Sequence, residues 1–573
     1  MDDLNLIFEI NEKSNSILID NILNDNGNDN DNDNENDNEN DNEKINVNDN
    51  VYTDTKICDF FKNKSITIGG SKLIEKIIKM PINNKELLRA RQKINYFINK
   101  SNQEILKNNE KDLLWIMTLE KELKEDLTIN LLFFSGFLIS NLNHYNIILS
   151  SYHLYKIVIL PIMSLSYPIS IIYGPYIYLN KYTPFKMDLY KYLKIIYEFI
   201  KIIFKFTGNI KIDITKIITI LLYIFLYLYA LYQSLYTCYI LYKTREKLMI
   251  KLNGLYNFIN TSLSIIKNCN NIWKPFLIYS SLTDEKLNKS IERLSKLKNN
   301  LATVYKLWKD DNYKKDIINI LKIIYTIDII NIISNLKKNN NWCIPTYEDT
   351  NTQIWNMNNP LLESNQISNP VNLSKNIIIT GVNAGGKTTY VKTITINIIL
   401  AQSIGIINAL KGNIYLYDAI NTFMRITDTL GKHSYFEAET SLCNSMIEVA
   451  EDLNKKGKRG LFIMDEPMHS TPPIEGISVA YSVAEYLAKI KGMTLIITTH
   501  FHHLIELEEN NKSLFINLSF LANYNDKTKT YDFNYKINRG GTKQIIAIEL
   551  LEKKKFNKEI IKSAIEIKNK LYI

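Results

Sequence analysis

The stretch Asn376-Ile-Ile-Ile-Thr-Gly-Val-Asn-Ala-Gly-Gly-Lys-Thr-Thr-Tyr390 decides how the C-terminal part of this chain is expected to fold. Residues 376–380 form a short apolar run typical of a buried strand, and residues 389–403 have the pattern of a helix that Gly405 can end. Between them, residues 381–388 fit the pattern G-x-x-x-x-G-K-[ST]. A strand, a glycine turn and a helix in this order predict a phosphate-binding loop of the P-loop (Walker A) type.

The residue types in this loop predict a nucleotide with β- and γ-phosphates, bound together with Mg²⁺. Glycines let backbone N–H groups curl around phosphate oxygens, and the N-terminus of the following helix adds positive potential. Lys387 is predicted to reach the β- and γ-phosphates, and the Thr388 hydroxyl is predicted to bind Mg²⁺. The residues assigned to nucleotide binding are Gly381, Asn383, Gly385, Gly386, Lys387, Thr388 and Thr389.

Two further apolar runs end in side chains that complete such a site. The run Leu461-Phe-Ile-Met precedes Asp465, predicted to hold Mg²⁺ through water, and Glu466, predicted to orient or deprotonate the attacking water. The run Thr494-Leu-Ile-Ile-Thr-Thr delivers His500 to the same sheet edge, where a neutral imidazole could contact the γ-phosphate or the water. We therefore assign Glu466 and His500 to catalysis, and Thr388 and Asp465 to the metal.

Two subsidiary expectations concern histidine and tryptophan near this site. His500, His502 and His503 are close enough in sequence to suggest zinc, but no cysteine or carboxylate stands nearby to complete a tetrahedral set, which disfavours a zinc site. Trp355 is the candidate for stacking on adenine.

Composition describes a basic chain with an acidic arm. The formal charge of +9 comes from 69 Lys and Arg against 60 Asp and Glu, and residues 24–43 hold nine of the acids and no base. The other 51 acids leave +18 on the rest, which indicates a polyanionic partner such as nucleic acid or an anionic membrane. Five scattered cysteines without a C-x-x-C pair suit a reducing compartment, and no signal peptide is recognised. An intracellular protein of the cytoplasm or nucleus, not a secreted one, is expected.

Two charge-free runs, residues 157–179 and 217–242, are long enough as helices to cross a bilayer. The alternative is that both are buried helices of a helical lever. The first run holds three prolines, which disfavours a straight helix, and the second holds seven tyrosines. The link between them carries eight lysines, which would oppose the positive-inside tendency if both flanks were cytosolic. Membrane insertion therefore remains open beside the buried-helix alternative.

The expected architecture is multidomain: a helical core and lever region, then a P-loop NTPase α/β domain of ABC type. Residues 342–370, rich in Asn and Pro, are expected to be loop-like. The predicted domains are a disordered Asn/Asp-rich arm at 1–50, a helical region at 51–126, an apolar helical region at 127–245 containing the two candidate transmembrane helices, a helical core or lever at 246–349, and the ATPase domain at 350–573.

The three elements at the sheet edge resemble the ATPase domain of the MutS family of DNA mismatch-repair proteins. The similarity is to the family's G-P-N-M-G-G-K-S-T loop and extends to motifs before and after it. The positions that carry it are Asn383, Gly385-Gly386, Ile398–Gly405, Arg425-Ile-Thr-Asp428, Gly431, Ser434, Phe436, Glu439, Thr498-Thr-His500, His503-Leu504 and Glu506, with a weaker likeness over Thr67–Ile98.

The resemblance implies an ATPase that works as a homodimer or as a heterodimer with another MutS-like subunit and that switches a clamp on double-stranded DNA. It also implies that Ser434 approaches the γ-phosphate bound by the partner subunit, so Ser434 joins the predicted catalytic residues. The alternative is a membrane-anchored MutS-like ATPase that has lost mismatch recognition. An ABC transporter or chromosome-maintenance ATPase is a weaker alternative, because the leucine-serine-glycine-glycine signature is missing.

Departures from the family pattern follow the second strand. The family usually reads D-E-L-G-R-G-T-S-T-x-D-G, whereas this chain reads Asp465-Glu-Pro-Met-His-Ser-Thr-Pro-Pro-Ile-Glu-Gly476. The two acids, Thr471 and Gly476 are kept, but two glycines and an arginine are replaced. The chemistry is expected to be retained, with subunit communication through this loop altered. The family's mismatch-reading domain, with its inserted Phe, is not expected in this chain.

Overall fold

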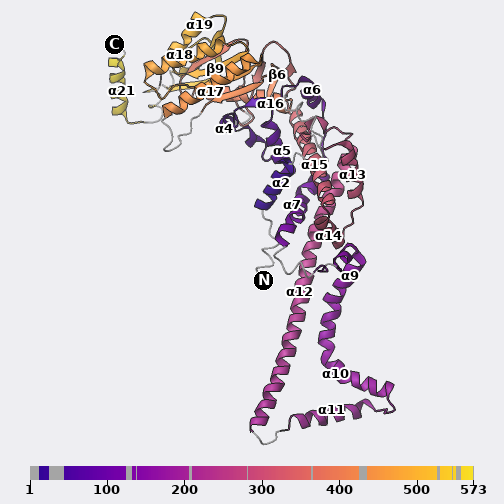
Figure 1. Cartoon of the computed structure of the whole chain (residues 1–573). Helices are drawn as coiled ribbons and strands as arrows, with labels where there is room; N and C mark the ends of the chain where they lie inside the picture. The colour runs from indigo at the N-terminus through magenta and orange to yellow at the C-terminus, as the bar shows by residue number, and fades with distance from the viewer. Residues whose placement is uncertain are drawn as a thin grey trace. The chain divides into compact units, whose positions relative to one another are not determined.

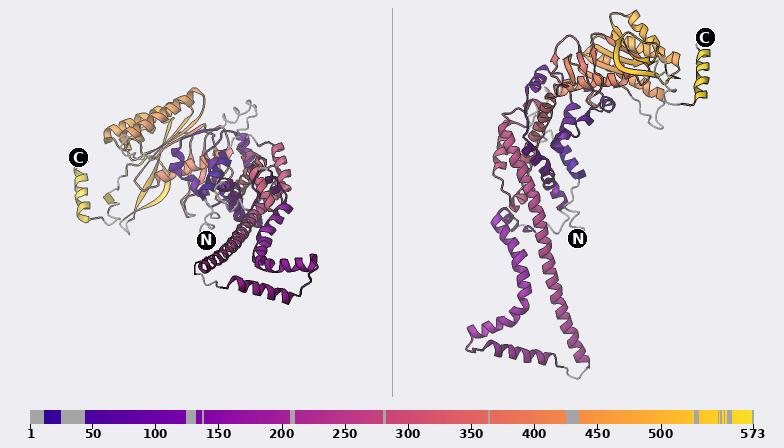
Figure 2. Two further views of the ribbon diagram at one scale, coloured as in Figure 1. Left: turned by 60° about the horizontal axis from the view of Figure 1, so that its bottom comes forward. Right: turned by 180° about the vertical axis from the view of Figure 1, so that it is seen from behind.

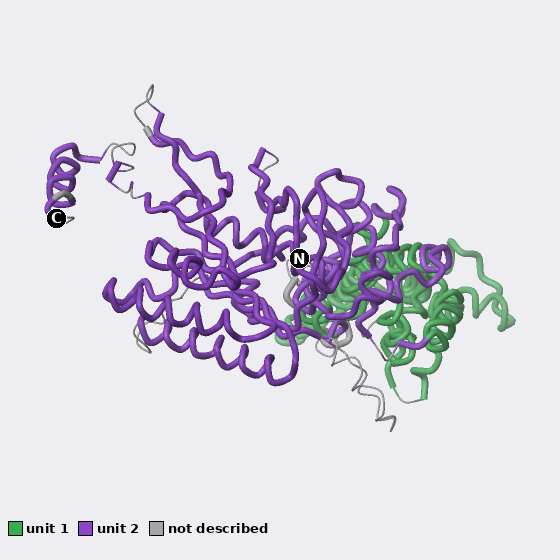
Figure 3. Tube along the Cα trace, turned by 90° about the horizontal axis from the view of Figure 1, so that it is seen from above, with its two compact units in different colours: residues 1–21, 105–263, 284–320 green, residues 22–104, 264–283, 321–573 purple. Residues whose placement is uncertain are grey.

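The computed structural model of the chain contains two compact units (Figure 3). Unit 1 comprises residues 1–21, 105–263 and 284–320, and unit 2 comprises residues 22–104, 264–283 and 321–573. The structure describes residues 12–24, 44–123, 132–136, 138–205, 210–279, 282–362, 365–424, 435–525, 530–544, 546, 548–549, 551 and 556–571.

Unit 2 is built on a seven-stranded sheet with the strand order β1-β7-β8-β9-β5-β10-β11. All neighbouring strands are parallel except β10 and β11, which form an antiparallel pair at one edge. The strands are β1 (Asn46–Val47), β5 (Asn376–Gly381), β7 (Ala419–Phe423), β8 (Gly460–Asp465), β9 (Met493–Thr499), β10 (Phe515–Asn525) and β11 (Thr530–Arg539). Every residue of β5 and β7 is buried, as expected for parallel strands covered on both faces.

Helices follow the parallel strands of this sheet (Figure 1). They are α16 (Lys387–Ser403), α17 (Tyr435–Lys455), α18 (Pro473–Lys489), η5 (His502–Ile505) and α19 (Glu506–Asn510), and a last helix, α21 (Lys558–Leu571), comes after the antiparallel strand β11. The apolar faces of α17 and α18 pack with one face of the sheet into a single core that includes Phe462, Ala484 and Ile497. The strands predicted at 376–380, 461–465 and 494–499, and the helix at 389–403, are thereby confirmed.

The prediction that residues 342–370 are loop-like holds for most of the described ones but is wrong for three short strands. These strands belong to a second sheet of order β2-β6-β3-β4, formed by β2 (Thr346–Tyr347), β3 (Gln353–Met357), β4 (Asn369–Asn372) and β6 (Ala409–Ile414). Pro370 is compatible with this sheet because β4 is an edge strand, where one backbone N–H is not needed for pairing.

N-terminal helices belong to the same unit as the large sheet. They are α4 (Asn50–Thr55), η1 (Ile57–Phe61), α5 (Ile68–Ile78) and α6 (Lys85–Lys93), with η4 (Lys274–Phe276) and most of α15 (Asp311–Lys337). Asp54 accepts a hydrogen bond from the Thr422 hydroxyl at 2.8 Å, and the buried Arg91 donates to the Pro275 carbonyl at 2.8 Å. The compact units therefore do not follow the predicted boundaries at residues 126, 245 and 349.

The predicted arm at residues 1–50 contains two ordered elements, α2 (Glu12–Asn24) and β1. Ile19, Ile22 and Leu23 of α2 are buried, so this segment has the apolar side chains that the Asn/Asp repeat lacks. The prediction of disorder is wrong for these two elements. The repeat at residues 25–43 lies outside the described residues.

Unit 1 is helical. Its elements are most of α7 (Lys100–Leu123), then η2 (Ser140–His144), α9 (Asn146–Leu154), the π-helical turn η3 (Tyr155–Ile159), α10 (Leu160–Tyr182), α11 (Leu189–Ile203), most of α12 (Ile210–Asn268), α13 (Asp284–Ser295) and α14 (Leu301–Lys309). Figures 1 and 2 show α9 and α10 running along α12, with α11 crossing at the end of this pair. The ribbon of α10 turns partway along its length, as expected for a helix that contains Pro168 and Pro175.

Three described helical stretches are long and apolar enough to cross a membrane, judged by length and composition alone: 146–182, 210–268 and 311–337. In the most apolar 18-residue windows, 6% of the first and 0% of the second are buried, against 89% of the third. The third is thus an interior helix. The alternative that the runs at 157–179 and 217–242 are buried helices is wrong for the described residues, because most of their apolar side chains are exposed.

Candidate nucleotide-binding site

The carboxyl ends of β5, β8 and β9 meet at one edge of the large sheet because these strands are parallel neighbours. The register pairs Ile379 of β5 with Thr498 of β9, and Asp465 of β8 with the same Thr498. The three strands therefore end side by side, and the residues that follow them lie at one edge of the sheet: the glycine loop, Asp465-Glu466 and His500. Parallel α/β sheets bind ligands at this edge.

The glycine loop is shaped by close approaches that side chains would prevent. Gly386 precedes α16 with φ of 105°, in the left-handed region that favours glycine. A Cβ on Gly381 would lie 2.7 Å from the Phe520 carbonyl oxygen, and one on Gly385 would lie 2.9 Å from the Val382 carbonyl oxygen. The loop consequently brings the N-terminus of α16, with its unpaired N–H groups, to the edge of the sheet.

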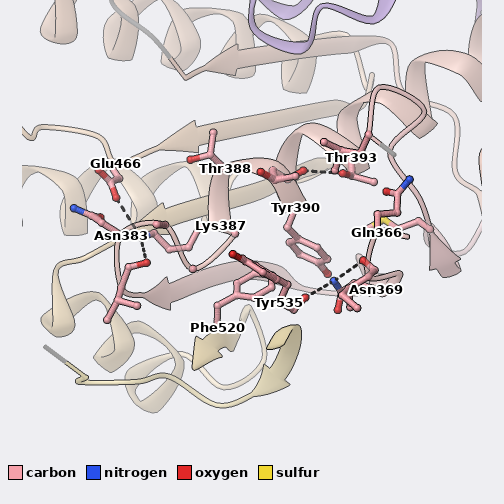
Figure 4. Close-up of a pocket in the computed structure, with 18 of the residues that line it drawn as sticks. Gln366, Asn369, Asn383, Lys387, Thr388, Tyr390, Thr393, Glu466, Phe520 and Tyr535 are labelled. Carbon is pink, nitrogen blue, oxygen red and sulfur yellow. Dashed lines mark hydrogen bonds and ion pairs between the residues drawn. The ribbon is translucent and has the colours of Figure 1, made fainter. Parts of the chain in front are cut away.

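Lys387 is the first residue of α16, and its side chain is only 5% exposed. Its ammonium donates to the Gly381 carbonyl at 2.9 Å and lies 3.3 Å from a carboxylate oxygen of Glu466 (Figure 4). A buried cation is thus held between the glycine loop and the acid that follows β8.

The Thr388 hydroxyl donates to Oδ2 of Asp465 at 2.7 Å, and the Thr498 hydroxyl donates to the other carboxylate oxygen. A hydroxyl and a carboxylate in contact supply the oxygen ligands that Mg²⁺ prefers. Thr388 and Asp465, predicted separately from two motifs, are therefore brought together in a geometry that could hold this ion.

A cavity of about 610 Å³ opens beside the glycine loop (Figure 4). This volume lies in the range of small-molecule sites. Its wall includes the loop residues Asn383, Gly385, Gly386, Lys387, Thr388 and Thr389, together with Glu466, Met357, Leu362, Ile367, Asn369, Tyr390, Phe520 and Tyr535.

The aromatic wall of the cavity was missed by sequence reasoning. Tyr535 and Phe520 line it. Trp355, the predicted adenine-stacking residue, is not among the residues of the wall, and its ring lies against the ammonium of Lys411. Asn369 positions β11 by donating to the Tyr535 carbonyl at 2.8 Å and accepting from the Ile537 N–H at 2.9 Å. Tyr535 follows the glycine loop by about 150 residues, and no spacing rule links the two.

His500 follows β9 and is half buried. Burial lowers the pKa of its imidazole, and the nearby His469 and Lys387 lower it further against the opposing effect of Glu466. His500 therefore stays neutral at neutral pH. Its ring centroid lies 5.0 Å from that of His469, a contact that the sequence did not indicate.

Of the remaining predicted residues, Ser434 lies outside the described residues, as do Arg425, Asp428 and Gly431 of the family motif. Glu439 is described and is 2% exposed. Its carboxylate accepts hydrogen bonds from the backbone N–H groups of His469 and Ser470, both at 3.2 Å. This motif residue thus holds the loop that follows Glu466.

These features define an α/β domain with a glycine turn at the N-terminus of a helix and a lysine, a threonine and two acids around it. Residues 377–572 match the family model described as MutS domain V. The C-terminal region therefore matches the family that the sequence motifs resemble.

Curated relatives agree with this assignment. The chain is 30% identical over 273 residues to a DNA mismatch repair protein MutS of Prochlorococcus marinus (strain MIT 9301). The aligned region covers 45% of this chain and 29% of that protein. It is 31% identical over 263 residues to the protein of the same name from Clostridium perfringens, covering 43% and 28%. The chain thus spans less than a third of the length of these relatives.

Proposed function

We propose that this chain is a P-loop ATPase of the MutS type, which binds ATP with Mg²⁺ in the cavity beside the glycine loop and hydrolyses it. The observation that carries the proposal is the meeting of Lys387, Thr388, Asp465 and Glu466 at one sheet edge, next to a cavity of about 610 Å³. The MutS domain V match over residues 377–572 supports the same activity.

The roles follow from chemistry and position. The N–H groups of residues 383–388 and the Lys387 ammonium would neutralise phosphate oxygens. Thr388 and Asp465 would hold Mg²⁺, which when bound neutralises charge on the β- and γ-phosphates. Glu466 would accept a proton from the attacking water, and neutral His500 would orient that water or the γ-phosphate. From the family resemblance we carry over a dimer in which Ser434 acts on the partner subunit's nucleotide.

Double-stranded DNA is the partner we propose for the ATP-driven clamp. The +18 that remains outside residues 24–43 would provide sequence-independent affinity by neutralising phosphates. The names of the relatives point to mismatch repair, which we extend to this chain only as part of the proposal.

Two measurements on the full chain test the DNA clamp. ATP turnover is measured with and without homoduplex, mismatched and branched DNA, and DNA affinity is measured as a function of salt concentration. We expect a falling affinity with rising salt; a slope near zero would contradict the DNA clamp.

A second candidate function is a membrane-anchored ATPase, and the surface of unit 1 favours it. Outward-facing apolar side chains of α10 and α12 are about half exposed, among them Ile162, Leu165, Leu222, Ile224 and Phe225. Monomeric soluble proteins rarely expose a contiguous apolar surface of this extent.

The side chains between α12 and the segment formed by η3 and α10 are polar or small, unlike those on the outside. The Ser164 and Ser234 hydroxyls lie 3.1 Å apart, the Tyr227 hydroxyl donates to the Ser164 carbonyl at 3.2 Å, and the Cys238 thiol lies 2.9 Å from the Ile157 carbonyl. Small and polar residues between helices, with apolar residues outside, are typical of helix pairs in a bilayer. We infer a hairpin inserted through residues 157–179 and 217–242.

Fractionation of cells that express the full chain tests this second function. We expect the protein in the membrane pellet after extraction with alkaline carbonate, together with its ATP turnover when assayed in detergent. Release into the soluble fraction would rule out the membrane-anchored form and leave an intracellular soluble clamp.

A further inference from the structure

Three side chains at the sheet edge form a cluster of metal-ligand type, and two of them are the residues assigned to ATP hydrolysis. Glu466 and His469 belong to the loop after β8, and His500 follows β9. One ligand atom of each, a carboxylate oxygen or a ring nitrogen, lies within 4.8 Å of the other two. The expectation from sequence that His500 lacks a carboxylate partner is therefore wrong, because folding brings it to Glu466 and His469.

The backbone around His469 is held in place on both sides. Glu466 and Met468 adopt φ of 54° and 59°, a left-handed conformation that is unfavourable for residues other than glycine. Met468 is 2% exposed within the core under the loop, and the buried Glu439 accepts the His469 and Ser470 N–H groups. Such strain persists only where the surroundings fix the backbone, so His469 is presented to His500 by a defined loop.

The donor set differs from that of the proposed Mg²⁺ position. Thr388 and Asp465 offer oxygen only, whereas the cluster offers two imidazole nitrogens and one carboxylate oxygen. Two histidines and a glutamate are a set that zinc accepts, with a fourth position left for water.

We propose that Glu466, His469 and His500 bind one divalent transition-metal ion of the zinc class, which inhibits ATP hydrolysis when bound. The claim that the ion binds depends only on the cluster, and the claim that it inhibits rests on the proposed function. A metal on Glu466 occupies the carboxylate that would accept the proton of the attacking water, and a metal on His500 occupies the imidazole that would orient it. His469, which stands where the family pattern reads arginine, supplies the ligand that makes this possible.

Zinc binding to the full chain, measured by isothermal titration calorimetry without nucleotide, is the first test. We expect one tight site in the wild type and at least a ten-fold weaker one in His469→Gln. His503→Ala, which removes an exposed histidine outside the cluster, is the matched control and keeps wild-type affinity. His469→Cys, which restores a ligand as a thiolate, is expected to bind zinc tightly again.

Unchanged zinc affinity in His469→Gln, or an equal loss in His503→Ala, would overturn the site. ATP binding by His469→Gln is measured alongside and is expected to be unchanged, which shows that a loss of zinc binding does not come from loss of folding.

ATP turnover with and without zinc tests the inhibitory role. Equimolar zinc is expected to lower the turnover of the wild type in excess Mg²⁺ at least ten-fold and to leave the turnover of His469→Gln unaffected. Equal turnover of the wild type with and without zinc would overturn the inhibitory role. A wild type that binds zinc but never hydrolyses ATP would instead count against the proposed function.

Discussion

The large sheet of unit 2 and the helical pair α10 and α12 of unit 1 use the same apolar residue types in opposite ways. Ile379, Phe462 and Ile497 of the sheet are 0% exposed, whereas Leu222, Ile224 and Phe225 of α12 are 53%, 50% and 64% exposed. The sheet places its polar side chains at strand ends, where they build a site. The helical pair places Ser164, Tyr227 and Ser234 between the two helices and many apolar side chains outside.

The difference teaches that an apolar run specifies burial but not what covers it. In the sheet the cover is supplied by this chain, through helices such as α17 and α18. On α10 and α12 none of the described residues covers the outer face, and a bilayer is the medium that would do so.

The largest contrast is expected in folding stability. Ile497→Ala should lower the free energy of unfolding of unit 2 by about 2–5 kcal/mol, because it removes fully buried methyl groups and leaves a cavity. Leu222→Ala removes an exposed side chain of unit 1 and should change the free energy of unfolding of that unit by less than about 0.5 kcal/mol. Hydrogen exchange of the β9 amides measures the first change and that of the α12 amides the second; an equal loss of protection in the two variants would contradict the comparison.

The next effect concerns nucleotide affinity. Lys387→Ala removes the buried ammonium that would bind phosphate, and charged hydrogen bonds of this kind contribute about 1.5–3 kcal/mol, or roughly 10- to 100-fold in affinity. Lys491→Ala, at an exposed position in the same unit, should leave ATP affinity within about two-fold. Titration of both variants with a fluorescent nucleotide provides the measurement. Similar affinities for the two variants would contradict a role for Lys387 in nucleotide binding.

A smaller effect is expected at α11, whose Lys191 and Lys194 are exposed beside apolar side chains. If the helical pair inserts into a bilayer, these lysines would contact anionic headgroups, and each would contribute about 1 kcal/mol to the binding free energy. The double change to Gln should weaken binding of the detergent-free protein to vesicles containing phosphatidylserine by about ten-fold or more. Lys489→Gln with Lys491→Gln is the charge-matched control in unit 2, and an equal loss there would point to non-specific attraction.

The smallest effect is the pH dependence of ATP turnover between pH 8 and 7. The pKa of His500 is lowered, mainly by burial, from an ordinary value of about 6.5, so protonation becomes appreciable only below that value. Turnover should therefore change by less than about two-fold in this interval and fall as the pH drops further. A steep fall that begins above pH 7 would contradict a neutral role for His500.

Sequence reasoning identified β5, β8 and β9 and the side chains at their ends because buried parallel strands have a plain apolar signal and the loop motif is local. It did not find Tyr535, Asn369 or His469, since each reaches the site through pairing or loop geometry between distant segments. The second sheet was missed because β3 and β4 are short and lie among Asn and Pro residues typical of loops.

The boundaries between domains were equally hard to predict. Asp54 reaches Thr422, and Arg91 reaches the Pro275 and Ser403 carbonyls, so early helices join the unit of the late sheet by long-range contacts that no shift in composition indicates. For α10 and α12 the sequence left burial and membrane insertion open, and the exposed fractions of their side chains decide against burial.

The central claim, that this sheet edge hydrolyses ATP, is tested most directly by Glu466→Gln in the full chain. The account predicts ATP affinity close to that of the wild type and turnover at least 100-fold lower, because the acceptor for the proton of the attacking water is removed while the phosphate-binding loop is intact. Glu509→Gln, at an exposed acid in the same unit, should turn over ATP normally. Undiminished ATP hydrolysis by Glu466→Gln would contradict the account.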